Sequence, residues 1–203
     1  MISDAMAAVL PRLKAADPAL VEDCAHILGA DGLAVSALLE DGGREVLWAS
    51  AGAGARFEEL QFTLGEGPGP DAARTGVAVL VSDVGAVRQD RWPALLPALA
   101  EHPVGAVFCF PLSLGAITVG VLTLIRENRG VLNASEMDDA LVLASALTAL
   151  LLGGEQNLLE PLSTGSSEDA VLHQAVVHQA TGMVSVQLSV RLSEALLYLR
   201  AHA

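Results

Sequence analysis

The longest apolar stretch of the chain, residues 105–126, reads GAVFCFPLSLGAITVGVLTLIR and carries no charge before its last residue. Valine, isoleucine, threonine and phenylalanine dominate it, and its second half alternates with period two, which favours strands. Pro111 would interrupt a helix, and Leu-Gly-Ala supplies a turn. The pattern predicts two adjacent antiparallel strands, 106–112 and 116–126, in a sheet with one buried face. A membrane-spanning helix is the alternative.

Shorter patterns on either side predict the rest of the sheet and the helices that cover it. Alternation over 33–40 and 44–50 around Asp-Gly-Gly indicates a hairpin, and 77–81 indicates a further strand. Residues 51–61 are glycine-rich and then weakly helical. Helical periodicity and N-cap signals predict helices over about 3–15, 19–28, 71–75, 93–100 and 134–152.

The helix expected over 134–152 opens with a capping box, Asn133 with Glu136. Its apolar stripes are broader than one sheet should need, so the pattern predicts a helix–helix contact with a second copy of the chain, hence a homodimer. Membrane insertion is the alternative, although the uncharged run falls short of a span. The candidates for the dimer seam are Leu143, Leu147 and Leu150.

The length of 203 residues suits one domain of ordinary size and a smaller additional segment. The expected parts are an N-terminal helix (1–16), a domain (17–152), a linker rich in glycine and serine (153–167) and a helical segment (168–203). Eleven basic against 24 acidic side chains give a net charge of −13. Such a surface repels phosphate backbones at long range, so nucleic-acid binding needs a local basic patch, and we expect no DNA partner.

The candidate chemistry is sparse. The two cysteines lie far apart in apolar surroundings, which indicates buried thiols in a cytoplasmic protein without a signal peptide. Five scattered histidines lack metal-ligand spacing, and the glycine-rich loop at 65–69 lacks the lysine of a phosphate-binding loop, so it is interpreted as a structural loop near a pocket mouth. We therefore expect no metal, no cofactor, no membrane partner and no enzymatic activity.

Residues 17–152 resemble a GAF domain in the order of their elements. The matching segments are GEGPGPDA (65–72), VAVLVSDV (77–84) and FPLSLGAITVGVLTLIR (110–126). The resemblance implies an α/β (α+β) fold, an antiparallel sheet flanked by helices, and a small-molecule sensor. The sequence lacks the cyclic-nucleotide pattern of that family and a cysteine placed for a chromophore. An apolar ligand pocket and a filled core both stay open; the pocket candidates are Val35, Trp48, Phe108 and Phe110.

Residues 168–203 resemble the first part of an ANTAR domain, through HQATGMVSVQL (178–188) and SEALLYLRAHA (193–203). That resemblance implies binding of a structured RNA hairpin in transcription antitermination. The RNA-binding candidates are Gln179, Gly182, Arg191 and Arg200. The chain stops after the second of the three helices of that family, and Ser189 and Arg191 replace its usual turn residues. Arg200 also fits an ordinary surface charge.

Together the patterns predict a cytoplasmic signalling regulator in which a GAF sensor controls an ANTAR-type, RNA-binding output. The alternative is a dimerising interaction module that no longer binds RNA because the third helix is absent.

Overall fold

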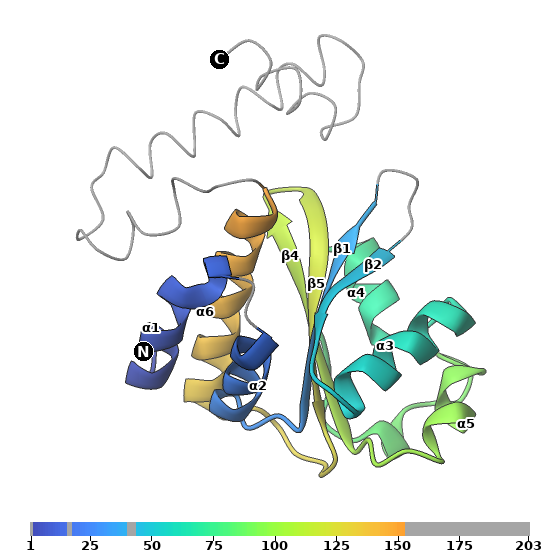
Figure 1. Cartoon of the computed structure of the whole chain (residues 1–203). Coiled ribbons are helices and arrows are strands. Elements are labelled where there is room, and N and C mark those ends of the chain that lie inside the picture. The colour runs from blue at the N-terminus through green and yellow to red at the C-terminus, as the bar shows by residue number, and fades with distance from the viewer. Residues whose placement is uncertain (1, 16–17, 40–43, 153–203) are drawn as a thin grey trace, which may run out of the picture.

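The computed structural model describes residues 2–15, 18–39 and 44–152, which form one five-stranded antiparallel sheet with helices on both faces (Figure 1). The sheet order is β2-β1-β5-β4-β3. Its strands are β1 (Gly32–Leu38), β2 (Arg44–Ala49), β3 (Val79–Val81), β4 (Ala106–Leu114) and β5 (Ile117–Arg126). The helices are α1 (Asp4–Val9), η1 (Leu10–Ala15), α2 (Pro18–Ile27), α3 (Ala53–Leu64), α4 (Pro68–Thr75), η2 (Val84–Ala86), α5 (Leu95–Leu99) and α6 (Ala134–Leu151).

The central hairpin confirms the strand prediction for the longest apolar run. β4 pairs with β5 from Ala106 opposite Arg126 to Leu114 opposite Ile117. Pro111 lies beyond Cys109, the last residue of β4 in register with β3, where a missing backbone N–H is tolerated. Among the described residues, no helix has the length and hydrophobicity needed to span a bilayer.

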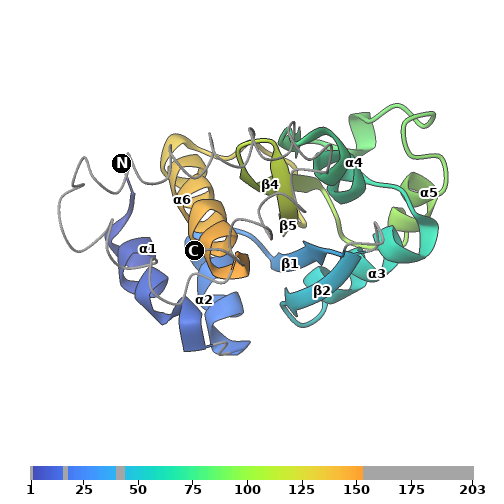
Figure 2. The same ribbon diagram turned by 90° about the horizontal axis from the view of Figure 1, so that it is seen from above.

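The hairpin was expected to have one well-buried face, and the structure covers both of its faces. One layer holds α1, η1, α2 and α6, and the other holds α3, α4 and α5 (Figure 2). On β4, Phe108 and Phe110 join the core under the first layer, while Val107 and Cys109 join the core under the second. Burial on both sides explains why this stretch reads as a nearly continuous apolar run.

Local chemistry accounts for most differences between the expected and the observed elements. The helix expected over 3–15 splits into α1 and η1, because Pro11 has no N–H and its ring opposes the carbonyl one turn earlier. β3 is two residues shorter than the strand expected over 77–81. α6 begins at the predicted capping box, in which the Asn133 side chain accepts from Glu136 N–H and the Glu136 side chain from Asn133 N–H.

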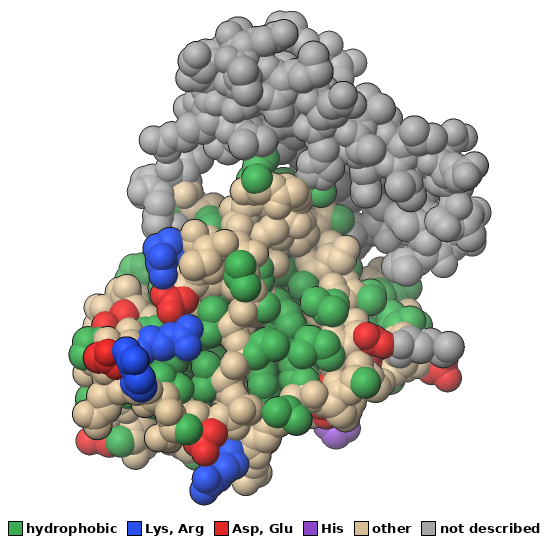
Figure 3. Space-filling view, turned by 180° about the vertical axis from the view of Figure 1, so that it is seen from behind, with side chains coloured by type: hydrophobic (Ala, Val, Ile, Leu, Met, Phe, Trp, Pro, Cys, Tyr) green, Lys and Arg blue, Asp and Glu red, His purple; other side chains and the backbone are tan. Residues whose placement is uncertain are grey.

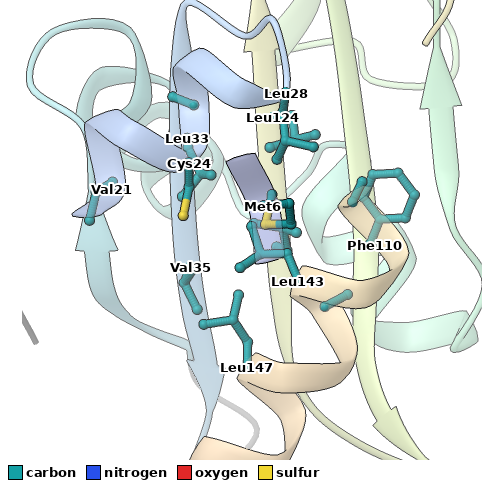
Figure 4. Close-up of a cluster of buried hydrophobic side chains, with 14 of the residues drawn as sticks. Met6, Val21, Cys24, Leu28, Leu33, Val35, Phe110, Leu124, Leu143 and Leu147 are labelled. Carbon is teal, nitrogen blue, oxygen red and sulfur yellow. The ribbon is translucent and has the colours of Figure 1, made fainter. Parts of the chain in front are cut away.

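The proposed seam on α6 is corrected by the packing of that helix. Leu143 and Leu147 point into the core between α6, β1 and α2, and Leu147 faces Val35 (Figure 4). The two leucines are each 1% exposed. They are therefore core residues of this chain and cannot be surface contacts of a dimer. Leu150 is half-buried. The large apolar side chain that α6 does expose is Leu141.

Candidate functional site

A buried carboxylate stands at the centre of the candidate site. The inward face of α3 consists of Gly54, Phe57, Glu58 and Gln61, spaced as one helical stripe. Two of these four core positions are polar, and both are at most 1% exposed. A buried charge is costly unless partners compensate it, so Glu58 has to be explained by its contacts.

Glu58 receives hydrogen bonds from three elements of the fold. Thr123 on β5 donates its hydroxyl to Oε1 at 2.8 Å. Gln61 donates its amide N–H to the same oxygen at 3.0 Å. Arg44, the first residue of β2, donates from Nη2 to Oε2 at 3.3 Å and forms an ion pair in which the glutamate is buried and the arginine is nearly so. We call Arg44, Glu58, Gln61 and Thr123 the Glu58 cluster.

The electrostatics of the cluster favour proton uptake by the carboxyl group. Burial raises the pKa of Glu58 above its ordinary value. The Arg44 guanidinium and the hydrogen bonds from Thr123 and Gln61 lower the pKa, but they do not cancel the effect of burial. The carboxyl group of Glu58 therefore takes up a proton more readily than an exposed glutamate does.

The glycine-rich loop before α4 is shaped around this cluster. A Cβ at Gly67 would lie 2.6 Å from Gln61 Oε1, and a Cβ at Gly69 would lie 2.7 Å from Arg44 Nη1. Gly67 also has φ +139°, and Gly69 N–H donates to Gln61 Oε1 at 2.7 Å. Glu66 accepts from the backbone N–H groups of Ala94 and Leu95, which ties the loop to α5. The loop is structural, as its sequence predicted, and its expected place near a pocket mouth stays a prediction.

One donor of the cluster has no acceptor. Arg44 Nη1 is buried and makes no hydrogen bond. The arginine side chain as a whole is 11% exposed. A guanidinium offers five N–H donors, and a buried donor without an acceptor costs free energy. The first turn of α4 lies directly against this nitrogen at Gly69. An acceptor for this nitrogen would have to fit between the guanidinium and the first turn of α4.

Neither cysteine is suited to nucleophilic chemistry. Cys109 lies beside the cluster, with Sγ 3.7 Å from the Thr123 hydroxyl, and burial, followed by the charge of Glu58, raises the pKa of its thiol. Burial, with Asp23 nearby, raises the pKa of Cys24 to about 11. Both thiols stay protonated at neutral pH. Within the part of the chain that is described, no group of three or more His, Cys, Asp or Glu residues could hold a metal ion.

The four predicted pocket residues lie under the opposite layer of helices. Val35 and Trp48 line a cavity of about 20 Å³ whose walls also include Cys24, Leu143 and Leu147. This volume matches a single water molecule, and its walls are apolar. Phe108 and Phe110 are 2% exposed and fill the core instead of lining this cavity. The structure favours the filled core on this side of the sheet.

The four RNA-binding candidates, Gln179, Gly182, Arg191 and Arg200, lie outside the described residues. Residues 153–167 and 168–203, the expected linker and helical segment, lie outside them as well.

Sequence reasoning missed the Glu58 cluster because its members come from three separate segments, β2, α3 and β5. Glu58 stands in Phe-Glu-Glu-Leu-Gln, which reads as an amphipathic helix with an acidic outer face. The phase of the helix gives the only local signal: Phe57 and Gln61 are four residues apart, and a stripe through them places Glu58 inside. Nothing near Arg44 indicates its partner, 14 residues further on.

Comparisons with known proteins point to one domain family. The sequence profile of the GAF domain matches residues 18–151. The GAF domain of the phosphoenolpyruvate-protein phosphotransferase from Acinetobacter superimposes with a TM-score of 0.58 at 10% identity, covering 80% of this chain and 96% of that one. The GAF domain of the same type of enzyme from Coxiella burnetii gives a TM-score of 0.55 at 17% identity, covering 74% and 96%. Comparison with curated protein sequences gives no match. At these identities the likeness of the structures concerns the fold alone.

Proposed function

This chain belongs to the GAF domain family, whose members are signalling and ligand-binding modules, and from that premise we propose that it senses a small anionic molecule through the Glu58 cluster. The observation that carries the proposal is Arg44 Nη1, a buried cationic donor without an acceptor. A carboxylate or other oxyanion bound there would receive charge-assisted hydrogen bonds.

Charge balance gives the proposed binding step a second requirement. Arg44 and Glu58 form a neutral pair, so an added anion would leave a buried net charge of −1. Uptake of one proton by Glu58 removes that charge, and the raised pKa of this carboxyl lowers the cost of the uptake. The ligand must also displace the first turn of α4, which lies against the guanidinium at Gly69.

A route from the cluster toward the C-terminal segment runs through β5. Thr123 contacts Glu58 under one layer of helices, while its neighbours Leu122 and Leu124 belong to the core that includes Leu143 and Leu147 of α6. A change at the cluster therefore acts on a strand that also supports α6. We propose that this strand transmits the signal, which requires that the ligand favours one of two packing states.

The test for the sensor is ligand binding to the 203-residue chain, with acetate, nitrate and inorganic phosphate as separate probes. An anion that binds the native state raises the melting temperature as its concentration rises. Binding should tighten as the pH falls, with uptake of one proton per anion measured by calorimetry in buffers of different ionisation enthalpy. Arg44→Gln should abolish the shift, and Arg88→Gln, at an exposed arginine, should leave it unchanged. A shift retained by Arg44→Gln, or binding that weakens at low pH, would contradict the proposal.

We propose further that the output lies in residues 168–203 and binds an RNA hairpin in the cytoplasm. The support is the resemblance of this segment to an ANTAR domain, with Arg200 as the leading contact. Few cations are present in the segment, so binding should be weak and should change little with salt concentration. Arg200→Ala should weaken hairpin binding by the 203-residue chain in a filter-binding assay, and Arg12→Ala is the control.

The second candidate function is a dimerising interaction module without RNA binding. The small size of the apolar cavity favours it, because a filled core needs no ligand on that face. Absence of hairpin binding by the unmodified 203-residue chain would support this candidate. In both cases we propose that the domain is not an enzyme, so bound probe should be recovered chemically unchanged.

A further inference from the structure

The outer edge of the sheet at β3 forms a groove that is apolar on one side and cationic on the other. β3 is the last strand in the sheet order, and no described strand pairs with its outer side. Val77 and Leu80 are 64% and 48% exposed. An open cleft of about 480 Å³ runs along this edge and is lined by Asp71, Arg74, Thr75, Val77, Val79 and Arg91, among others. Figure 3 shows arginines and an apolar area together on this face.

The charge of the groove is opposite to that of the whole chain. Arg74 and Arg91 share one carboxylate, that of Asp71, at 3.1 and 3.5 Å. The same carboxylate also accepts from the Trp92 indole N–H at 3.2 Å. The Arg74 side chain is largely accessible and that of Arg91 partly so, and the groove keeps a local charge of +1 in a chain of net charge −13. An occupant with acidic and apolar residues suits it.

An open apolar strand edge without charge is a hazard for aggregation, and proteins usually cover such edges. β3 reads Val-Leu-Val and contains neither a lysine nor a proline. Pairing of two copies through β3 would bring Arg74 and Arg91 of both chains together. Repulsion between these like charges disfavours a second copy as the occupant of the groove. A segment of the same chain has the advantage of an effective concentration in the millimolar range.

We propose that residues 155–162 of this chain dock along the groove, with Glu160 toward Arg74 and Leu159, on the opposite face of the extended segment, toward Val77 and Leu80. This segment reads EQNLLEPL, combining two glutamates with three leucines in a chain that has just left α6. The docked segment adds an extended strand to the free edge, so main-chain hydrogen bonds supply affinity and the side chains supply register. The inference goes beyond the sensor and output proposed above and requires neither.

The reach of the chain permits this placement. Leu151 Cδ1 lies 3.1 Å from where Gly120 would carry a Cβ, and Gly120 is opposite Leu112 in the sheet. Val79 is opposite Cys109, which places β3 roughly 10 Å along β4 from Leu112 and about 5 Å across. The path from Leu152 to Glu160 covers eight residue steps, about 26 Å when extended, which is enough to pass around the sheet edge.

Hydrogen exchange on the 203-residue chain tests the docking. We expect the β3 amides to exchange at least tenfold faster in Arg74→Glu than in the unmodified chain. Glu160→Arg should give the same acceleration without altering the folded domain, and the Arg74→Glu, Glu160→Arg double variant should restore slow exchange. Arg88→Glu, a reversal at an exposed arginine that does not line the groove, is the matched control.

Three results would overturn the proposal. They are unchanged β3 exchange in both single variants, failure of the charge swap to restore protection, and protection that depends on protein concentration, which would assign the cover to a second copy. Because Arg74 is 72% exposed, its reversal should leave the fold intact, and near-ultraviolet circular dichroism checks this.

Discussion

At the scale of single residues, the loop before α4 and the buried charges of the Glu58 cluster are fitted to each other. Gly69 has no side chain at the point where Arg44 Nη1 lies, and Gly67 has none where Gln61 lies. The three polar side chains Arg44, Glu58 and Gln61 therefore require the glycines. A motif that reads as loop chemistry in the sequence serves in the structure to make space for buried polar groups.

Gly69→Ala should destabilise the fold by about 1–3 kcal/mol, the usual cost of overpacking. The new Cβ would lie 2.7 Å from Arg44 Nη1, and the ion pair with Glu58 prevents the guanidinium from moving away freely. In an Arg44→Ala background the same substitution should cost less, because the nearest obstructing atom is gone and only the contacts with Gln61 at 3.0 Å are left. Urea denaturation of the four proteins measures this coupling. Equal costs in both backgrounds would show that Arg44 does not limit the loop.

Glu58 should make the fold less stable as the pH rises. Its folded-state pKa is raised, so between the ordinary value of 4.5 and the raised value the native state holds a proton that the unfolded state releases. The free energy of unfolding, relative to that of Glu58→Gln, should fall over this window by up to about 1.4 kcal/mol per pH unit and then level off. Below pH 4.5 the difference should be constant. Denaturation from pH 4 to 8 measures it, and a rising difference would mean a lowered pKa.

At the scale of elements, α6 packs one face into the core of its own chain. Its buried residues Leu143 and Leu147 belong to the same core as Leu33 and Val35 of β1. Leu147→Ala should cost about 2–5 kcal/mol of unfolding free energy, as expected for a cavity in a packed core. Leu141→Ala, at the exposed position of the same helix, should change stability by less than about 0.5 kcal/mol. Comparable losses from both variants would contradict the observed helix phase.

The elements could largely be predicted from sequence because their signals are local. The capping box at Asn133 and the hairpin around Gly115 lie next to what they control. The second layer on the sheet could not be predicted from the apolar run, since a strand buried on both faces lacks the alternation that would assign its sides. The buried face of α6 was misassigned because its stripes exceed what the sheet covers, and nothing local says which stripe faces inward.

At the scale of the whole molecule, a homodimer is still our prediction, with its contact moved from the core leucines to the outer surface of α6. Leu141→Glu places a charge there without disturbing the core, since Leu141 is 52% exposed. Light scattering at micromolar concentration should give a dimer for the unmodified chain and a larger monomer fraction for Leu141→Glu. A Leu80→Glu variant, at the sheet edge, separates this contact from an association through β3. If Leu141→Glu had the same mass as the unmodified chain, the outer surface of α6 would not be part of the dimer contact.

The close approach of Gly69 to Arg44 also has a consequence for how this family diverges. Positions 44 and 69 are far apart in the sequence but cannot both carry a large side chain, so their residues should covary. Relatives that keep arginine at position 44 should keep glycine at 69, and those with a side chain at 69 should carry a small residue at 44. A lineage that loses the pair would also lose the need for a glutamate at 58. The residues at positions 44, 58 and 69 of a relative should then indicate whether it keeps the buried charge or has an apolar core in its place.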